Sequence, residues 1–372
     1  MKFIQIAGTK GKGSTSTYLA NILTAAGYRC GLFVSPHIRR ENERVSVDGR
    51  LIPDADLQRL LAQTTESGYF RKFYQVALAW FAEQGVEVAV METGLGGRYD
   101  PATSLPICQL LLTRIGMDHM EILGDTIQKI ALEKAAAIRM GGSVICAPQE
   151  ERVQHIFDAT CHLRRARQSC VRPEQIRVRA DGSFDFDGFS NLRLQNPASM
   201  QYVNAAVAVR AAVRLRENGI FVSEEAIRLG LAQTQLLGRQ QYLPGADALI
   251  DGAHNVDSLR FLHDTLRTAY QKRRKVLIAA AMKDKDVSYF GEMAAEQFER
   301  VYASQMDYER CMSAEQMAQQ FLPGTPVELC ANTAEAYAKA AAYAQKRGAM
   351  IVFAGSIYLA GEALDLLLPE QA

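Results

Sequence analysis

Residues 2–14, Lys-Phe-Ile-Gln-Ile-Ala-Gly-Thr-Lys-Gly-Lys-Gly-Ser, decide the fold. The apolar run 2–7 predicts a short buried strand ended by glycine. After Ser14, apolar residues from Leu19 to Ala26 recur at helical spacing. A glycine-rich turn lets backbone N–H groups approach an anion, and the N-terminus of the following helix favours negative charge. The stretch therefore predicts a loop that binds nucleotide phosphates.

Four residues of this loop are candidate phosphate ligands: Gly11, Lys12, Gly13 and Ser14. Lys12 can reach the outer phosphates, and the Ser14 hydroxyl is available to Mg²⁺. The spacing departs from the Walker pattern Gly-x-x-x-x-Gly-Lys-Ser/Thr because Gly13 separates Lys12 from Ser14. A tight strand-to-helix turn with exposed lysines is the alternative. The strand before the loop and the helix after it favour phosphate binding.

Length and composition indicate a protein of two domains without a membrane or nucleic-acid partner. The chain has 372 residues, 48% hydrophobic and 22% charged, with a net charge of +1, so no global basic field attracts nucleic acid. Seven cysteines without a C-x-x-C pair argue against a disulfide framework or a zinc site, and Cys108 and Cys146 lie in apolar runs typical of a core. No apolar run approaches the ~18 residues of a membrane span. The phosphate-loop strand begins at once, which leaves no room for a signal peptide, so we expect a cytoplasmic protein.

Three further strand ends carry polar side chains. The strand 30–34 runs into Ser35-Pro36-His37, the strand 86–91 ends at Glu92, and the strand 108–113 precedes Asp118-His119. Parallel α/β sheets bind ligands at the carboxyl ends of their strands. Glu92 beside a glycine-rich loop is a candidate Mg²⁺ ligand, with an ion-paired or helix-capping glutamate as the alternative. His119 remains open between a ligand and a structural histidine.

The second half of the chain predicts a change of domain near residue 240. A helix over 200–216 contains Gln201 and Asn204, and the polar segment 237–245 with its proline and glycines breaks the pattern. Short strands then lead into polar loops, among them Asp251-Gly-Ala-His254 and Gly355-Ser356. We expect an α/β protein with an N-terminal domain over 1–237, a linker over 238–245 and a smaller doubly wound domain over 246–372.

Taken together, the motifs resemble those of the folylpolyglutamate synthase/dihydrofolate synthase branch of the Mur ligase superfamily, over essentially the whole chain. The matching motifs are, in order, Gly8–Ser14, Ser35-Pro-His37, Asn42-Glu-Arg44, Glu92–Arg98, Asp118-His119, Leu123–Thr126, Glu133-Lys134, Gln201-x-x-Asn204, Gly238-Arg239, Asp251–Asn255 and Gly355-Ser356. The resemblance implies a P-loop-type Mur ligase ATPase domain with a mostly parallel sheet and a C-terminal Rossmann-like domain, with ATP held between them. Members activate a carboxylate as an acyl phosphate, which the amine of glutamate then attacks.

The same resemblance implies a role for each matching residue. The loop Gly11–Ser14 would hold phosphates, and Lys12, Lys134, His119 and His254 would serve catalysis. Two Mg²⁺ ions are implied, the first on Ser35 and Glu92 and the second on His119, supported by a carbamylated Lys134. The implied contacts to ATP are Asn204, Arg239 and Asp251, and those to the incoming glutamate are His254 and Ser356.

Several positions depart from the family pattern. In the family, the arginine is commonly followed by one variable residue and then by Asp-Ala/Cys-Thr-Asn. Here Arg98 and Tyr99 are followed by Asp100-Pro-Ala-Thr-Ser104, which breaks this pattern. The usual glycine before Gln201 is also missing. Alanines follow Lys134 where glycine is common, and the chain is shorter than typical members. None of these changes removes an ATP or Mg²⁺ residue, so ligase chemistry is better supported than a folate acceptor.

The leading hypothesis is an ATP-dependent ligase that adds L-glutamate to a folate, or also to dihydropteroate, and acts as a monomer on small-molecule substrates. The alternative within the superfamily is a ligase that joins another amino acid to a non-folate carboxylate. A nucleotide-binding regulatory protein is disfavoured because Lys12, Glu92, His119 and Lys134 are all present. An NAD-dependent dehydrogenase is disfavoured because lysines replace the Gly-x-Gly-x-x-Gly pattern.

Overall fold

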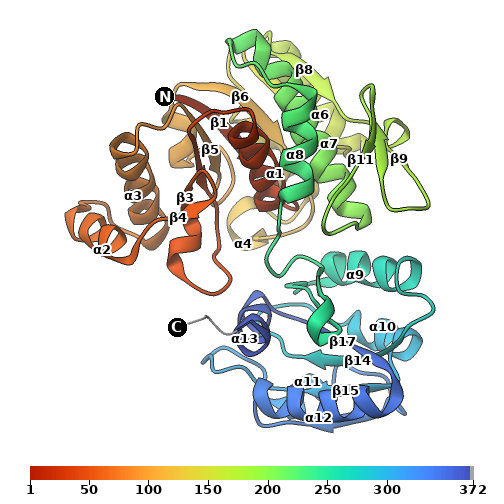
Figure 1. Ribbon diagram of the computed structural model, residues 1–372. Helices are drawn as coiled ribbons and strands as arrows, with labels where there is room; N and C mark the ends of the chain where they lie inside the picture. The colour runs from red at the N-terminus through yellow and green to blue at the C-terminus, as the bar shows by residue number, and fades with distance from the viewer. Residues whose placement is uncertain (369–372) are drawn as a thin grey trace. The chain divides into compact units, whose positions relative to one another are not determined.

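The computed structural model describes residues 1–368 and divides the chain into two compact units, Met1–Gln235 and Leu236–Ala372. Each unit contains a sheet with helices packed on it, which confirms the predicted α/β class (Figure 1). The last four residues of the predicted C-terminal domain, 369–372, lie outside the described part of the chain. None of the helices in residues 1–368 has the length and apolar character that a membrane crossing requires.

The first unit is built on an eight-stranded sheet. Its strands are β1 Lys2–Ala7, β2 Cys30–Phe33, β3 Val45–Val47, β4 Arg50–Leu51, β5 Val88–Glu92, β6 Ile107–Leu112, β7 Ser143–Cys146 and β8 Arg167–Cys170. Their spatial order is β4-β3-β2-β5-β1-β6-β7-β8. All neighbours from β2 to β8 are parallel, and β3 and β4 add an antiparallel edge. Parallel strands are covered on both faces, which explains their apolar sequences.

The first strand of the chain lies at the centre of this sheet. β1 pairs with β5 on one side and with β6 on the other, and Ile4 lies opposite Val90 and Gln109. Because the three strands are parallel, the loops that follow them emerge at the same edge. That edge therefore receives the phosphate loop, Glu92 and the segment after Leu112.

Helices cover both faces of the sheet. They are α1 Lys12–Ala25, α2 Asp54–Gln63, α3 Tyr69–Glu83, α4 Met120–Leu123, α5 Ile127–Ala135, α6 Glu151–Leu163, α7 Ser199–Arg214 and α8 Glu224–Gln233. Side chains alternate along a strand, so Phe3 and Ala7 of β1 point to one face, and Ile4 and Ile6 to the other. Phe3 belongs to the core formed with α2 and α3, and Ala7 to the core formed with α5 and α6. α1 packs against α7 and α8 and contacts β2 and β5, so these three helices form the opposite layer.

A small antiparallel sheet follows α6 in sequence. It consists of β9 Arg177–Val178, β10 Phe184–Phe186 and β11 Phe189–Leu192, in the order β11-β10-β9. Asp187 and Gly188, with φ of 55° and 88°, form the turn between the last two strands. The Phe184 ring contacts the ring of Tyr202 on α7 at 5.3 Å, which attaches the small sheet to the first unit.

The second unit contains a six-stranded sheet. Its strands are β12 Gln241–Leu243, β13 Ala248–Ile250, β14 Arg274–Ala279, β15 Arg300–Ala303, β16 Val327–Leu329 and β17 Ala349–Ala354, in the order β12-β13-β17-β14-β15-β16. Every pair is parallel except β12 with β13. Its helices are α9 Val256–Thr268, α10 Phe290–Gln297, α11 Ala314–Ala318, α12 Thr333–Arg347 and α13 Ile357–Leu367.

Residues 238–245, expected to be a linker, belong to the second unit, and three of them form a strand of its sheet. Gln241, Tyr242 and Leu243 pair with Ile250, Leu249 and Ala248 as an antiparallel edge strand. Pro244 and Gly245, whose presence indicated a break, belong instead to the short 3₁₀ turn that connects the two strands. Proline is tolerated there because its missing N–H falls in the turn, outside the hydrogen-bonded ladder.

The packing of α8 on α1 predicts the effect of one substitution. A Cβ built on Gly230 of α8 would lie 2.5 Å from Cα and 2.6 Å from the backbone N of Ile22. Because these are backbone atoms, one helix would have to move. We expect Gly230→Ala to lower the free energy of unfolding by about 1–3 kcal/mol, although alanine is preferred over glycine in helices by about 1 kcal/mol. Equilibrium urea unfolding measures the change.

Gly245→Ala is the matched control, because no heavy atom lies within 4 Å of a Cβ built there. Its unfolding free energy should stay within about 0.5 kcal/mol of the parent. An unchanged urea midpoint for Gly230→Ala would show that α1 and α8 are not in the tight contact described here.

Candidate functional site

The loop between β1 and α1 packs so closely on its surroundings that it needs glycine. Gly8 and Gly11 have φ of 150° and 85°. A Cβ on Gly8 would lie 1.9 Å from the Thr113 Oγ1, and a Cβ on Gly11 would lie 2.2 Å from the Asn204 Oδ1. Asn204 on α7, predicted as an ATP contact, therefore lies directly against the predicted phosphate loop.

Glu92 joins two other predicted residues to this loop. Its carboxylate is buried at the end of β5, with Oε1 3.8 Å from the Lys12 Nζ. Its Oε2 accepts a hydrogen bond of 3.0 Å from the backbone N of Ser35. A Cβ on Gly13 would lie only 3.4 Å from the same Oε2. Lys12, Gly13, Ser35 and Glu92 thus form one cluster at the carboxyl edge of the sheet, with Ser14 buried in the first turn of α1.

The segment that carries Ser35 is held by the motif Asn42-Glu43-Arg44, to which the sequence assigned no role. The Glu43 carboxylate accepts hydrogen bonds from the backbone N of Ile38 and of the two residues after it. The Arg44 Nε donates to the His37 Nδ1 at 3.0 Å. The Asn42 Nδ2 donates to the carbonyl of Ile52 at 2.8 Å.

Two aromatic rings fix the guanidinium of Arg44. It lies 4.9 Å from the ring centroid of Tyr69 and 5.2 Å from that of Phe73, and the residue is buried. Burial lowers the pKa of Arg44, while Tyr69, Glu41 and Glu92 oppose this shift. The aromatic faces offset part of the desolvation of a buried cation. The result is a rigid support for residues 35–40.

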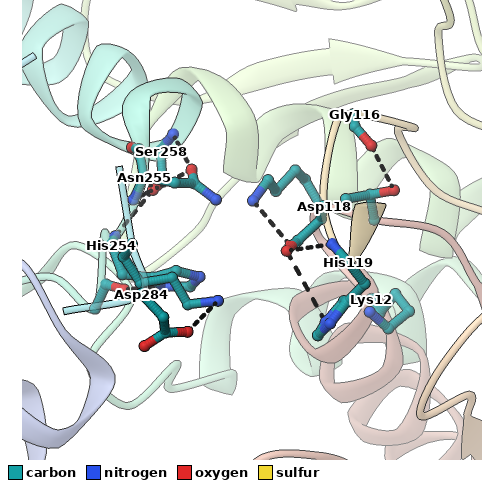
Figure 2. Close-up of polar contacts among 12 residues, drawn as sticks. Lys12, Gly116, Asp118, His119, His254, Asn255, Ser258 and Asp284 are labelled. Atoms are coloured by element: carbon teal, nitrogen blue, oxygen red, sulfur yellow. Dashed lines mark hydrogen bonds and ion pairs between the residues drawn. The ribbon is translucent and has the colours of Figure 1, made fainter. Parts of the chain in front are cut away.

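Asp118 connects the loop after β6 to the phosphate loop. Its Oδ2 lies 3.5 Å from the Lys10 Nζ, and its Oδ1 lies 3.9 Å from the His119 Nε2 (Figure 2). The Thr9 hydroxyl donates to the carbonyl of Gly116 at 3.2 Å. His119 begins α4 in a left-handed conformation with φ of 50°, and half of its side chain is exposed.

Lys134 on α5 is buried beside the same loops. Burial, together with the charge of Lys12, lowers the pKa of Lys134 to about 7, against the opposing effect of Asp118, Asp100 and Glu133. Near neutral pH a large fraction of such a side chain is an uncharged amine. A Cβ on Gly97 would lie 3.0 Å from the carbonyl of Lys134, so the glycine-rich loop after Glu92 packs on this turn of α5.

A pocket joins these groups within the first unit. It is lined by Gly8, Thr9, Lys12, Gly94, Leu95, Asp118, His119, Leu123 and Lys134. The structure thus brings together the predicted Lys12, His119 and Lys134 at one pocket, with Glu92 beside Lys12 and Ser35 hydrogen-bonded to Glu92. Within residues 1–368, no three His, Cys, Asp or Glu side chains converge as ligands for one metal ion.

The sequence assigned no role to two acidic residues of this region. Asp118 was matched only as the neighbour of His119. Asp100 is buried and accepts hydrogen bonds from the backbone N of Gly94 at 2.8 Å and of Ala102 at 2.9 Å. Burial raises the pKa of Asp100 against these hydrogen bonds. The position of Asp100 just after a glycine-rich loop could have indicated its structural role in the sequence, because the N–H groups of such a loop need a nearby hydrogen-bond acceptor.

In the second unit, Asp251 follows β13 and lies beside Arg239. The Asp251 Oδ1 accepts a hydrogen bond of 2.7 Å from the backbone N of Ala253. Burial raises the pKa of Asp251 to about 6, although Arg239, Ala253 and Gln240 favour the carboxylate. The backbone N of Gly252 donates to the carbonyl of Gly238 at 2.8 Å, which brings Arg239 to this strand end.

His254 and Ser356 lie on neighbouring loops of the same unit. The His254 Nδ1 lies 2.8 Å from the carbonyl of Gly252. Because a carbonyl only accepts, the proton of this contact is on Nδ1. The backbone N of Gly355 donates to the carbonyl of Ala253 at 2.8 Å, so the two loops are joined. Ser356 is buried and caps α13 by accepting a hydrogen bond from the backbone N of Tyr358 at 3.1 Å.

Asn255 organises the segment after His254. Its Oδ1 accepts a hydrogen bond of 3.0 Å from the backbone N of Ser258, and the Ser258 Oγ accepts one from the backbone N of His254, also at 3.0 Å (Figure 2). The capping of α9 thereby fixes the backbone position of His254.

The chain is similar in sequence to proteins of one known family. Residues 237–357 match the family model described as the Mur ligase, glutamate ligase domain. A curated relative, the dihydrofolate synthase/folylpolyglutamate synthase of Bacillus subtilis, is 34% identical over 312 residues, which cover 77% of this chain and 72% of the relative.

Solved structures agree over nearly the whole chain. E. coli FolC in complex with DHPP and ADP is 26% identical with a TM-score of 0.86, covering 98% of this chain and 88% of that one. Mycobacterium tuberculosis folylpolyglutamate synthase complexed with ADP is 26% identical with a TM-score of 0.88, covering 99% and 91%. This chain therefore belongs to the folylpolyglutamate synthase/dihydrofolate synthase family of the Mur ligase superfamily.

Proposed function

We propose that this protein is an ATP-dependent ligase that joins L-glutamate to the carboxylate of a folate. The cluster of Lys12, Glu92 and Ser35 around the phosphate loop carries the proposal. Family membership supports it, because the curated relative is a dihydrofolate synthase/folylpolyglutamate synthase.

The proposed reaction has two displacements. A carboxylate oxygen of the acceptor attacks the γ-phosphorus of ATP, the bond to the bridging oxygen breaks, and ADP leaves. The amine of glutamate then attacks the acyl carbon, the phosphate leaves, and the amine loses a proton. No side chain has to act as a nucleophile, so the protein contributes positioning and charge stabilisation.

The residues of the first unit are suited to bind the phosphates of ATP. Backbone N–H groups of Gly11, Gly13 and Ser14 at the start of α1 would hold the phosphates, with Lys12 on the outer ones. Asn204, already against Gly11, would contact the nucleotide beside them. In the second unit, we propose that Arg239 and Asp251 contact nucleotide and that His254 and Ser356 contact the incoming glutamate.

The donor set fits Mg²⁺. Mg²⁺ usually takes one or two carboxylates and fills its octahedral shell with water and phosphate oxygens, which suits the single buried carboxylate of Glu92 beside the phosphate loop. We propose that Glu92 and the Ser35 hydroxyl hold one ion and that His119 contributes to a second. Bound there, the ions would offset the negative charge of the phosphates.

We also propose that Lys134 is carbamylated. Its neutral amine would attack CO₂ to form an N–C bond and lose a proton, which changes an uncharged amine into an anion with two oxygens. The lowered pKa of Lys134 supports this step, because only the free amine is nucleophilic. The anion would also remove the repulsion between Lys134 and Lys12 and provide oxygens next to His119.

Dependence of turnover on the acceptor tests the substrate assignment. With Mg·ATP and L-glutamate, we expect ADP release to depend on a folate acceptor, measured with tetrahydrofolate and dihydropteroate offered separately. Release with tetrahydrofolate alone indicates a tail-extending synthase, and release with both indicates a bifunctional enzyme. A protein that binds ATP but releases ADP with neither would disprove the folate assignment and leave a ligase for another carboxylate.

Lys12→Ala should reduce this turnover by at least about a hundredfold, since it removes a cation placed on the developing phosphate charge. Lys129→Ala is the matched control, because the Lys129 ammonium is exposed and pairs with Asp125 on the surface. Equal turnover of the two variants would disprove the phosphate role of Lys12.

Carbamylation of Lys134 gives a spectroscopic prediction. In ¹³C-labelled bicarbonate, the native protein should show one carbamate carbon signal that Lys134→Gln lacks. Loss of the signal in CO₂-free buffer should accompany loss of turnover, and both should return with bicarbonate. A signal that persists in Lys134→Gln would assign the carbamate to another amine.

Nucleotide binding should depend on the charge of Asp251. Its pKa of about 6 means that acidification through pH 6 adds a proton and removes a hydrogen-bond acceptor for the nucleotide. We expect ADP affinity, measured by calorimetry, to fall more steeply between pH 7 and pH 5 in the native protein than in Asp251→Asn. Parallel pH profiles of the two proteins would exclude Asp251 from the nucleotide site.

A further inference from the structure

Three of the seven cysteines converge at the ends of two neighbouring strands of the first unit. Cys146 is the last residue of β7 and Cys170 the last of β8, and the two lie directly opposite each other in the parallel register. Cys161 of α6 is buried in the same core cluster, against which Cys170 packs. The function proposed above uses none of these thiols.

The backbone already places Cys146 and Cys170 within reach of a disulfide. Neighbouring strands lie about 4.8 Å apart, and disulfides join residues whose Cα atoms are about 4.4–6.8 Å apart. The register therefore places the two side chains on the same face of the sheet, at a backbone separation that a disulfide can span. Each sulfur also accepts a hydrogen bond of 3.4 Å from a glutamine Nε2, Cys146 from Gln168 and Cys170 from Gln154.

The environments of the two thiols differ in a way that separates an attacking from a resolving role. Cys146 is fully buried, whereas Cys170 is partly exposed. The hydrogen bond from the Cys146 thiol lowers the pKa of Cys170, and the Gln154 Nε2 donates a second hydrogen bond to its sulfur at 3.4 Å. The pKa of Cys146 is raised by the same contact and by burial. The less buried residue is thus the one with more thiolate character, which is the form that attacks disulfides.

We propose that Cys170 and Cys146 form a redox-modification site for low-molecular-weight disulfides such as glutathione disulfide. The Cys170 thiolate attacks one sulfur of the oxidant, whose S–S bond breaks and releases one thiolate. The Cys146 thiol then loses its proton and attacks the Cys170 sulfur, which releases the second thiolate. Two protein thiols are oxidised to one disulfide, and one small disulfide is reduced to two thiols.

The position of the pair in the fold suits a reversible site. β7 and β8 end at the same edge of the sheet as β1 and β6, so the pair lies at the edge that carries the phosphate loop. Cys170, at the end of its strand, is the less buried of the two residues, so we expect thiol reagents to react there first. Disulfides of this kind in a reducing compartment are transient. The proposal rests on the strand register and does not depend on the proposed ligase activity.

The experiment uses the full, reduced chain with glutathione disulfide as the probe and peptide mapping without reduction as the readout. Trypsin separates the three thiols, because Cys146, Cys161 and Cys170 fall in peptides 140–152, 153–164 and 168–177. We expect the joined peptide 140–152/168–177 to exceed any other cysteine pairing at least about tenfold, and to disappear after dithiothreitol.

Cys170→Ser should abolish the joined peptide, whereas Cys330→Ser, which removes a buried thiol of the second unit, should keep it. Glutathione retained on Cys170 without a joined peptide would overturn the resolving role of Cys146. A joined peptide containing Cys161, or no loss of thiols in the folded native protein, would overturn the proposal. The map of the native protein decides these outcomes even if Cys170→Ser does not fold.

Discussion

Close approach of other chain segments to the backbone of residues 8–13 is the constraint on which the first unit depends. Gly8 lies against Thr113 of the segment after β6, Gly11 against Asn204 of α7, and Gly13 near Glu92 of β5. A side chain at either of the first two positions would push away the segment that faces it. The absence of Cβ atoms therefore lets three distant parts of the sequence meet around a turn whose N–H groups can face an anion.

The same convergence gathers charges that have to be balanced. Lys12 lies beside Glu92, Lys10 beside Asp118, and Lys134 is buried between Lys12 and acidic neighbours. A buried cation near another cation is unfavourable, which is why the pKa of Lys134 is lowered. Phosphate binding would relieve the repulsion among the lysines, and the lysines would in turn favour the negative charge of the nucleotide. Such an arrangement of perturbed groups is typical of a functional site.

The motif Asn42-Glu43-Arg44 matched the family pattern in sequence, and the structure shows that it supports the segment next to the phosphate loop. Its side chains hold the segment 35–40 and the strand region near Ile52, and two aromatic rings fix the guanidinium of Arg44. The motif thus places Ser35 next to Glu92 without taking part in the proposed chemistry. Asp100 supports the glycine-rich loop after Glu92 by accepting a hydrogen bond from the backbone N of Gly94.

Local sequence was sufficient to predict much of this protein. The apolar run before Gly8 and the periodic residues after Ser14 predicted a strand, a loop and a helix, because burial and backbone freedom are local properties. The same reasoning predicted strand ends at Glu92 and near Ser35, and hence a common edge of a parallel sheet. Family membership followed from many motifs in one order, and the comparisons confirmed it.

Tertiary structure decided what depends on residues far apart in the sequence. The pairing of Gln241–Leu243 with β13 turned an expected linker into an edge strand, because an edge needs a partner that local composition does not reveal. Burial of Lys134, and with it the lowered pKa, results from loops that begin more than thirty residues away at Glu92 and Lys12. The contact between Cys146 and Cys170 arises only from the register of β7 and β8. Desolvation and nearby charges depend on which residues are neighbours in three dimensions. The sequence therefore shows that Lys134, Cys146 and Cys170 are present, but only the fold determines their pKa values and contacts.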